Sequence, residues 1–492
     1  MLNPSNEQRE IRIAKLKKLE EMGINPYPQI YRPTHTSAEI AEKYKELPPD
    51  TQTEDEVVVA GRVKAYRNSG MFMDIYDKDG KIQIFCSKEH LPDSEQEKIA
   101  LIDIGDFIGV KGFVKRTKRG EITVNAQEVT FLCKSLLPLP EKFHGLADVE
   151  VRYRQRYLDL ITNEESFKTL QNRSKIIASI RNTLTSKGIT EVETPILHPI
   201  LGGANAKPFI THHNALDMPL FLRIAPELYL KRLIVGGFSG VFEIGRNFRN
   251  EGISIKHNPE FTMMEVYWTY KDYNDMMDLA EEIIRNAAKA ANNGSAVVKY
   301  GDVEIDLDKP FARRSMIDLV KEYTGLDFNE IKDLPQAMQA IQAAGIHLDN
   351  EPRNWGEALQ AVFEAKVEEH LVQPTHVIDH PKEVSPLTKT HRSDPRLVER
   401  FETYINTWEM CNAYSELSNP IDQRERFEEQ VKQREAGDDE ANMMDEDFVT
   451  ALEYGMPPTG GLGIGIDRLI MILTNSASIR DVIAFPTMRR KD

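Results

Sequence analysis

Charged residues are concentrated in FRNEGISIKHNPEF (248–261), which brings Arg249, Glu251 and His257 close together in the chain. A second candidate cation, Arg468, follows the glycine-rich run GGLGIGI (460–466) at the start of an apolar stretch. Each guanidinium can hold two oxygens at once, and glycines let a ligand approach the backbone closely. The two arginines, directed at one cleft, would therefore suit a polyphosphate.

Two glutamates, Glu402 and Glu409, could hold the magnesium ion that a polyphosphate brings, because hard cations prefer carboxylate oxygens. Their positions have opposite parity, so on a straight strand the two side chains would point to opposite faces. They can share a face only if the chain turns between them, and residues 405–407 (INT) offer a place for that turn.

Strand parity sorts the polar residues, because successive side chains of a strand alternate between faces. Three runs each place polar or aromatic residues on a single face: Glu243, Asn247, Arg249 and Glu251; Phe261, Met263, Glu265 and Tyr267; Asn412, Tyr414 and Glu416. The first two runs predict an antiparallel hairpin, and all three together predict one polar cleft. The alternative is a solvated sheet face with surface ion pairs, which accounts for one such strand but poorly for three.

The composition bounds the class of protein. At 492 residues, 40% hydrophobic and 28% charged, the chain predicts a globular protein of more than one domain. The formal charge of −16 argues against indiscriminate coating of nucleic acid, although residues 107–120 form a local basic run. Cys86, Cys133 and Cys411 are isolated, so we expect reduced thiols and neither a disulfide framework nor a structural zinc. With no apolar span and no apolar signal core, we expect a cytoplasmic protein.

The N-terminal part predicts a small barrel. Five short β-rich runs between residues 56 and 133, separated by Gly- and Asp-containing turns, are typical of an OB fold, which binds oligonucleotides across one face. Phe72 and Gln83 lie where a base could stack and be read by hydrogen bonds, although core packing or a solvated edge is as good an interpretation of either alone. Residues 5–22 predict a helix that ends at Gly23, either a docked arm or an accessory RNA contact.

The predicted fold is an all-β OB barrel followed by an α+β domain whose antiparallel sheet is flanked by helices. The predicted parts are an N-terminal helical arm (1–55), the barrel (56–135), a linker (136–150) and the α+β domain (151–492). Within the last part we expect a long helix over 166–188, a strand over 189–197 that carries Pro195, and a helical insertion over about 312–372.

At this point the residues resemble a known family, the class II aminoacyl-tRNA synthetases, and within it the lysyl members. KGITEVETPIL (187–197), FRNEGISIKHNPEFTMMEVY (248–267) and GLGIGIDRLIM (461–471) are similar to the three class motifs. Further runs look lysyl rather than aspartyl or asparaginyl: RYRQRYLDL (152–160), PFITHHNALD (208–217), RIAPELYLKRL (223–233) and AGDDEA (436–441). The resemblance covers residues from about 56 to 488, including the barrel, which in this family reads the anticodon.

The resemblance implies a two-step ligase. Lysine and ATP would form lysyl-adenylate and pyrophosphate, and the lysyl group would then pass to the 3′ end of tRNA(Lys). The lysine carboxylate is already a nucleophile, so the first step needs alignment and charge neutralisation rather than a Ser or Cys. The resemblance also implies Mg²⁺ as cofactor, held by Glu402 and Glu409, and a homodimer formed through residues around 170–198.

By similarity, Arg249 and Arg468 would be the catalytic residues of the nucleotide site. Arg249 would hold the α-phosphate and the lysine carboxylate, Glu251 the adenine amino group, and His257 the outer phosphates. Phe261 would stack on one face of adenine. Arg468 would cover the other face of adenine and touch the γ-phosphate.

The resemblance also implies a lysine site: Gly203, Glu227 and Glu265 at the α-ammonium, Asn412 at the carboxylate, and Tyr267 and Glu416 at the ε-ammonium. A buried carboxylate that awaits a positive charge discriminates against neutral side chains, which would leave it unpaired. Ornithine would be harder to exclude, since one methylene is worth only roughly 1–3 kcal/mol.

In the barrel, Phe72, Gln83 and Glu128 match positions that in lysyl members contact the central anticodon uridine. The sequence departs from the bacterial pattern at Thr407 and Trp408, before the second metal glutamate, and at Lys207, where Arg is usual. Two other functions stay open: a synthetase-like paralogue that lysylates a non-tRNA acceptor, and a non-catalytic RNA-binding module.

Overall fold

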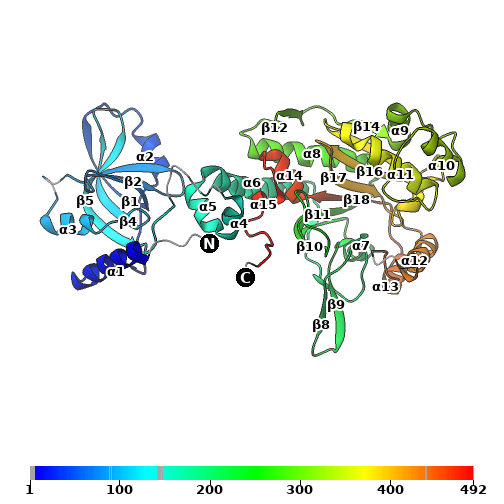
Figure 1. The fold of residues 1–492 in the computed structure, drawn as a ribbon, viewed down its shortest axis with the longest axis horizontal. Coiled ribbons are helices and arrows are strands. Elements are labelled where there is room, and N and C mark those ends of the chain that lie inside the picture. Colours follow the sequence, from blue (N-terminus) through cyan, green and yellow to red (C-terminus); the bar gives the residue numbers. More distant parts are fainter. Residues whose placement is uncertain are drawn as a thin grey trace. The chain divides into compact units, whose positions relative to one another are not determined.

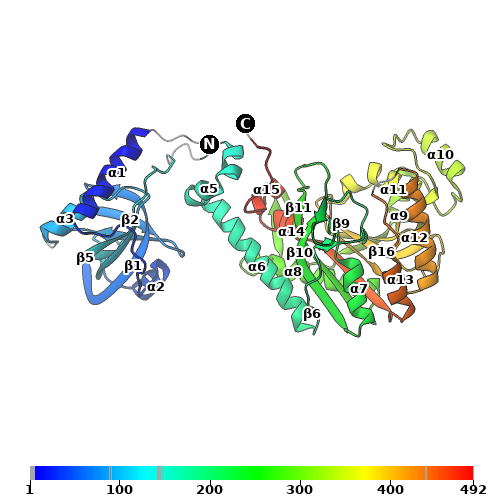
Figure 2. The same ribbon diagram turned by 90° about the horizontal axis from the view of Figure 1, so that it is seen from below.

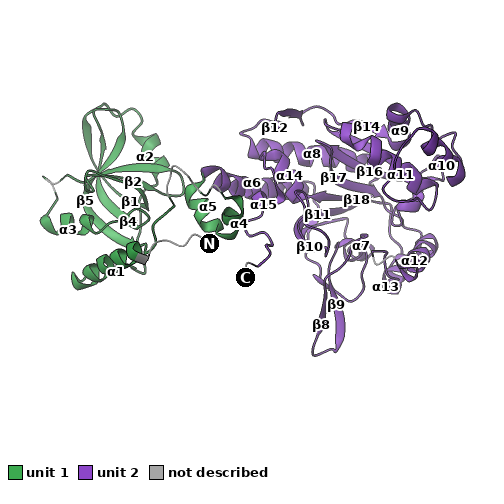
Figure 3. Ribbon diagram, viewed as in Figure 1, with its two compact units in different colours: residues 1–163 green, residues 164–492 purple. Residues whose placement is uncertain are grey.

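A computed structural model describes residues 6–87, 89, 91–140, 146, 148–437 and 440–490. The chain divides into two compact units, residues 1–163 and residues 164–492, called here the barrel unit and the sheet unit (Figure 3). Our predicted boundary lies slightly earlier, at residue 150. Residues 141–145 and 147 of the predicted linker, and Asp438 and Asp439 of the AGDDEA run, lie outside the described residues.

Five strands of the barrel unit form a closed barrel in the order β1-β2-β3-β5-β4 (Figure 1). They are β1 (Thr51–Arg67), β2 (Phe72–Tyr76), β3 (Lys81–Phe85), β4 (Phe107–Arg116) and β5 (Ile122–Cys133). Neighbouring strands are antiparallel except for β3 and β5, which are parallel. Alternate side chains point inward, as Val57, Val59 and Val63 of β1 do. The predicted five-stranded barrel is confirmed.

The helices of the barrel unit are α1 (Asn6–Glu21), α2 (Ser37–Lys43), α3 (Asp93–Ala100), α4 (Val149–Arg154) and α5 (Arg156–Thr162). Helix α1 ends before Gly23, whose φ of 73° only glycine adopts easily. It is fastened to the barrel: Leu19 is buried in the barrel core, Arg12 donates to the carbonyl of Ile104 at 3.0 Å, and Lys15 pairs with Asp103 at 2.6 Å. The arm is therefore docked on the barrel, as predicted.

The sheet unit is built on eight strands in the order β14-β15-β16-β17-β18-β11-β10-β6. Their bounds are β6 (Thr190–Glu191), β10 (Gly240–Phe248), β11 (Glu260–Thr269), β14 (Ala312–Ser315), β15 (Thr375–Pro381), β16 (Leu397–Ile405), β17 (Trp408–Ser415) and β18 (Thr459–Gly465). The sheet is antiparallel except at its two edges, where β6 pairs with β10 and β14 with β15 in parallel. The predicted antiparallel sheet is confirmed.

Two small sheets accompany the large one. One has the order β7-β9-β8, from β7 (Leu197–His198), β8 (Ile210–His213) and β9 (Met218–Leu222); Figure 1 shows its β8–β9 hairpin projecting from the large sheet. The other pairs β12 (Val297–Tyr300) with β13 (Val303–Asp306).

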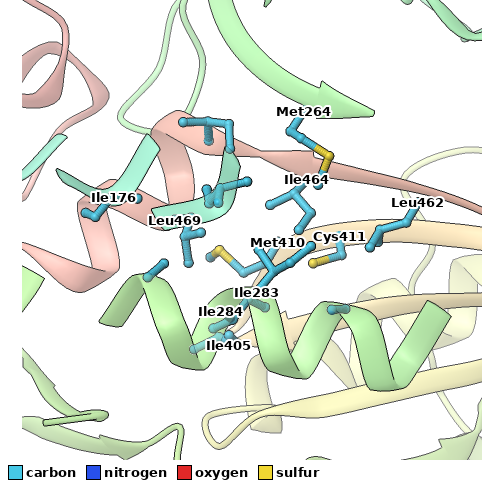
Figure 4. Close-up of a cluster of buried hydrophobic side chains, with 14 of the residues drawn as sticks. Ile176, Met264, Ile283, Ile284, Ile405, Met410, Cys411, Leu462, Ile464 and Leu469 are labelled. Carbon is cyan, nitrogen blue, oxygen red and sulfur yellow. The ribbon is translucent and has the colours of Figure 1, made fainter. Parts of the chain in front are cut away.

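The helices of this unit are α6 (Glu164–Ser186), α7 (Glu227–Val235), α8 (Tyr273–Ala291), α9 (Met316–Thr324), α10 (Leu334–Ala343), α11 (Trp355–Lys366), α12 (Pro420–Glu435), α13 (Glu446–Glu453), α14 (Ile466–Leu473) and α15 (Ile479–Val482), with 3-10 turns η1 (Glu368–His370) and η2 (Lys382–Val384). Helices α6, α8 and α14 pack on one face of the large sheet (Figure 2). In the close-up of Figure 4, Ile283 and Ile284 of α8 face Met410, Cys411 and Leu462 of the strands. This core holds in place the strands whose opposite faces carry the polar residues.

The predicted strand and helices of the sheet unit can be compared with the structure. The strand over 189–197 is wrong, because β6 ends at Glu191 and Pro195 lies between β6 and β7. Proline has no backbone N–H for a ladder, so the extended pairing cannot run through it. The long helix is confirmed as α6. Residues 312–372 begin with strand β14 and continue with the helical elements α9 to η1, and their being an insertion stays a prediction.

The three cysteines are free thiols, and Cys86 and Cys411 lie in the two main cores. Burial raises the pKa of each of these two thiols to about 12, so they are unreactive at neutral pH. None of the described helices is long and apolar enough to span a membrane.

Candidate active site

A pocket of about 420 Å³ opens on the face of the large sheet away from α6 and α8. This is within the range of small-molecule sites. The structure places around it each of the residues that the sequence assigned to nucleotide, lysine and metal: Gly203, Glu227, Arg249, Glu251, His257, Phe261, Glu265, Tyr267, Glu402, Glu409, Asn412, Glu416 and Arg468.

Strand parity explains how the sheet supplies these side chains. Strands β10 and β11 form the predicted antiparallel hairpin, in which Glu243 pairs with Glu265. On β11, Glu265 and Tyr267 line the pocket, whereas Met264 and Val266 enter the core on the opposite face. The prediction that Glu243 lines the cleft is wrong. Glu243 is buried in an ion pair with Arg223 at 2.5 Å and supports the strand from outside the pocket.

Glu402 and Glu409 meet at the pocket because the chain turns between them, as their parity required. Asn406 and Thr407 have φ values of 52° and 64°, which form a tight turn between β16 and β17. A register shift follows on β17, so that Tyr404 pairs with Glu409. Trp408 begins β17, and its ring packs edge-on against Tyr300, with 5.3 Å between the ring centres. Of the two departures from the bacterial pattern, Thr407 therefore lies in the turn and Trp408 at the start of the strand.

Basic side chains gather at one end of the pocket, where Arg249, His257 and Arg468 form what is called here the basic cluster. Arg468 donates to the backbone carbonyl of Glu409 at 3.0 Å and to Nε2 of His257 at 2.9 Å. Because arginine can only donate, Nδ1 of His257 carries the proton and donates to Ser254 Oγ at 2.7 Å. Burial and the Arg468 charge lower the pKa of His257, which is therefore neutral at pH 7.

Within the basic cluster, Arg249 is the member that interacts with both Arg468 and the pocket carboxylates, Glu265 of the other end included. Its guanidinium sits 5.1 Å from the centre of the Phe261 ring, and in the described part of the chain its buried Nε has no hydrogen-bond partner. Burial lowers its pKa, opposed by the charges of Glu251 and Glu409. An arginine keeps its charge in proteins, so Arg249 is a desolvated cation with unused donor capacity, suited to a small anion.

Carboxylates gather at the other end, where Glu227, Glu265 and Glu416 form the acidic cluster. Their exposed fractions are 4%, 6% and 1%. Burial, reinforced by the Glu227 charge, raises the pKa of Glu265 to about 8. Burial also raises the pKa of Glu416 well above its ordinary value, opposed by Lys231. Three buried carboxylates that interact with one another favour a ligand that brings positive charge.

Gly461 permits this end of the pocket to form. A Cβ atom there would lie 1.9 Å from Oε1 of Glu416 and 2.8 Å from the Tyr267 ring. We expected the strand glycines to make room for a ligand; at Gly461 the room is taken by a ligand-facing carboxylate of the protein.

Sequence reasoning missed Lys231 and Arg400, and it placed Tyr414 on the face of the cleft without a role. Lys231 pairs with Glu227 and Glu416, Tyr414 donates to both oxygens of Glu227 at 2.8 and 2.9 Å, and Arg400 donates to Asn412 at 3.0 Å and to Glu402 at 2.5 Å. A signal existed for each. Lys231 follows Glu227 by one helical turn, and Tyr414 and Arg400 share strand parity with the predicted residues beside them.

The magnesium prediction fits the donor set. Glu402 and Glu409 both present carboxylates to the pocket beside the basic cluster. Burial and the Glu402 charge raise the pKa of Glu409, a cost that a divalent cation would relieve. Among the described residues no cluster of three or more His, Cys, Asp or Glu forms a complete protein cage, so phosphate and water oxygens would supply the other ligands.

The predicted anticodon residues lie on the barrel unit. Phe72 and Gln83 are on the outer side of β2 and β3, where the Phe72 ring lies tilted against Phe85 with 5.0 Å between ring centres and Gln83 accepts a hydrogen bond from Thr123 at 3.0 Å. Glu128 lies five residues beyond Thr123 on β5, opposite Lys111 of β4. The structure thus brings the first two side chains to one face and places the third farther along the barrel.

The fold and the pocket together define a class of protein, and comparison with known families agrees with it. Residues 148–489 match the family described as tRNA synthetases class II (D, K and N), and residues 57–132 match the OB-fold nucleic acid binding domain. The chain therefore belongs to the class II tRNA synthetases of the D, K and N group, as the sequence motifs predicted.

Full-length relatives point to one member of that group. A lysine–tRNA ligase of Sinorhizobium medicae is 54% identical over 488 residues, which are 99% of this chain and 98% of the relative. A lysine–tRNA ligase of Rhizobium meliloti gives the same figures, and one of Carboxydothermus hydrogenoformans is 54% identical over 99% of both chains.

Proposed function

We propose that this protein activates lysine with ATP and transfers the lysyl group to the 3′ end of tRNA(Lys). The observation that carries the proposal is the polarity of the pocket, which joins an acidic cluster to a basic cluster through Arg249. A ligand with two ammonium groups and a carboxylate suits the first cluster and Arg249. A polyphosphate suits the second.

At the basic cluster, Arg249 holds the α-phosphate together with the lysine carboxylate. Its free donor capacity supports this role, because binding supplies partners that its buried Nε lacks. Arg468 and His257 hold the outer phosphates, and an anion there favours protonation of His257, which Arg468 now suppresses. Phe261 offers a ring face to adenine and Glu251 accepts from its amino group.

At the acidic cluster, Glu227 and Glu265 receive the α-ammonium beside the backbone of Gly203. Glu416 and Tyr267 receive the ε-ammonium. Oε1 of Glu416 is buried and lacks a hydrogen-bond partner in the described residues, so a substrate ammonium would satisfy it. Asn412 accepts a hydrogen bond from Arg400, which holds its side chain, and it faces the lysine carboxylate.

The first step is an attack of the lysine carboxylate on the α-phosphorus, which releases pyrophosphate. Pocket residues align the two substrates and neutralise charge that develops on the phosphate oxygens. Glu402 and Glu409 would hold Mg²⁺, which would supply further neutralisation of charge on the outer phosphates. In the second step the terminal ribose hydroxyl of tRNA attacks the lysyl carbonyl, and AMP leaves.

Selection of tRNA is assigned to the barrel, where Phe72, Gln83 and Glu128 contact the anticodon. The stacking face of Phe72 and the amide of Gln83 support this role for two of the three. We also propose that the enzyme is a cytoplasmic homodimer, which light scattering of the purified protein and its cell fractionation would test.

ATP–pyrophosphate exchange with a panel of amino acids, followed by tRNA charging, tests the proposal. We expect exchange that depends on lysine, and lysyl-tRNA as the product. Exchange without charging would favour a paralogue that lysylates another acceptor. Loss of both, with tRNA binding retained, would favour a non-catalytic RNA-binding module.

A further inference from the structure

Lys231 is a lysine of the protein inside the proposed lysine site. It lies on α7, one turn after Glu227, and its side chain is 0% exposed. Its ammonium lies 2.5 Å from Oε1 of Glu227 and in closer ion-pair contact with Oε2 of Glu416. Oε2 of Glu416 is therefore held by Lys231, whereas Oε1 has no hydrogen-bond partner in the described residues and keeps acceptor capacity toward the pocket.

Every ring around Lys231 favours its charge. The centres of the Tyr414, Tyr267 and Phe448 rings lie 5.6, 5.8 and 6.0 Å from the ammonium. Tyr414 also donates to both oxygens of Glu227, which fixes the carboxylate that Lys231 contacts. Burial works against the charge of Lys231, but Glu227 and Glu416 outweigh burial and raise its pKa. Lys231 is therefore a permanent internal cation at neutral pH.

The number of charges in the acidic cluster indicates what the Lys231 cation does. Glu227, Glu265 and Glu416 carry three negative charges when all are ionised, and Lys231 offsets one of them. Two negative charges remain, which equals the number of ammonium groups on a lysine substrate. A buried charge without a partner is costly, so a matched count favours a ligand with two ammonium groups.

We propose that Lys231 is a positioning and specificity-determining residue, which neutralises one carboxylate of the acidic cluster and aims Glu227 and Glu416 at the two ammonium groups of the substrate. The inference rests on the proposed lysine activation and deepens it. Lys231 does not touch the reacting atoms; it acts through the two carboxylates.

The alternative is a purely structural ion pair that holds α7 against the strand region at Glu416. The two accounts differ in the number of protons that they predict to be released when lysine binds. Without Lys231 the acidic cluster carries one more uncompensated negative charge, which the empty pocket would relieve by taking up a proton. That proton must leave when lysine binds. A structural pair would change stability without changing the number of protons released.

The test compares wild type, Lys231→Met, Lys231→Arg and the control Lys271→Met. Lys271, just before α8, is also paired with the acid four residues later, Asp275 at 3.0 Å, but it lies outside the pocket. Lysine binding is titrated calorimetrically at pH 7 in two buffers of different ionisation enthalpy, which gives the protons released. Exchange kinetics give KM for lysine and for ATP from pH 6.5 to 8.5.

We expect Lys231→Met to raise KM for lysine at least about tenfold, with KM for ATP unchanged, and to release about one more proton per lysine than wild type. Its pH profile for KM should shift to higher pH. Lys231→Arg keeps the charge and should restore the wild-type proton count, and Lys271→Met should match wild type throughout.

An unchanged proton count and pH profile in Lys231→Met, or equal losses for lysine and ATP, would overturn the inference. If Lys231→Met does not fold, Lys231→Arg decides: a raised KM for lysine with an altered proton count contradicts the charge argument. Failure of the wild type to show lysine-dependent exchange would instead refute the proposed function.

Discussion

The two ends of the pocket treat their charges in opposite ways. In the acidic cluster, the three carboxylates are buried and share an internal counterion, Lys231. In the basic cluster, His257 is exposed and Arg249 keeps an unpartnered buried Nε within the described chain. The proposed lysine site and the proposed phosphate site therefore arrange their charged groups in different ways. One end is enclosed and charge-matched, and the other keeps its two arginines and a neutral histidine available for an anion.

The largest expected effect comes from removing the residue between the two ends. Arg249→Ala should lower the rate of adenylation by about 10³-fold, because a preorganised cation that faces developing phosphate charge is lost. ATP–pyrophosphate exchange measures this loss, and Arg424→Ala, which breaks only the exposed pair with Glu446, serves as the control. Filter binding of tRNA should stay unchanged, since the proposed anticodon contacts lie on the barrel. Equal losses in exchange and tRNA binding would refute this division of labour.

Breaking the acidic end alone should give a selective defect. Glu416→Gln keeps the shape of the side chain and removes its charge, so we expect KM for lysine to rise about 100-fold. KM for ATP, taken from the same exchange assay, should be unchanged. A uniform loss for both substrates would show that Glu416 does not serve the ε-ammonium.

How far the sequence predicts this comparison depends on whether partners are local. Strand parity found Glu265, Tyr267 and Asn412, because alternation on a strand needs no knowledge of distant residues. It also located the turn that unites Glu402 with Glu409. It could not show that Lys231 meets Glu416, because that contact depends on how α7 packs beside the end of β17.

The same limit explains the errors. Parity alone assigned Glu243 to the cleft, whereas Arg223, from the segment between β9 and α7, covers it. The expected strand over 189–197 ignored the effect of Pro195 on pairing. Local rules therefore predict which face a side chain takes, and tertiary packing decides what covers that face.

A pH series would sharpen the comparison, because the acidic end holds a carboxylate, Glu265, whose pKa lies within the working range. Burial raises the pKa of Glu265 to about 8, so below that pH the empty pocket holds a proton that must leave before the α-ammonium binds. KM for lysine should therefore fall as the pH rises from 6.5 to 8, by about tenfold per pH unit at most. Steady-state exchange measures it, and Glu265→Gln should flatten the profile. A flat wild-type profile would contradict the assignment.

The smallest effect is expected outside the pocket. Gln83→Ala removes one amide from the barrel face, and we expect kcat/KM for tRNA to fall about tenfold. Lysine-dependent exchange of the same variant is the internal control and should be unchanged. A fall in exchange would show that the barrel substitution disturbs the sheet unit, and unchanged charging would remove Gln83 from the anticodon site.

The most direct test of the central claim, that one pocket joins a lysine end to a phosphate end, is a paired titration of lysine and ATP into Glu416→Gln and Arg468→Ala. The account predicts opposite outcomes. Glu416→Gln should lose lysine binding and keep ATP binding, whereas Arg468→Ala should lose ATP binding and keep lysine binding. If each variant weakened both ligands equally, the division of the pocket into two ends would be wrong.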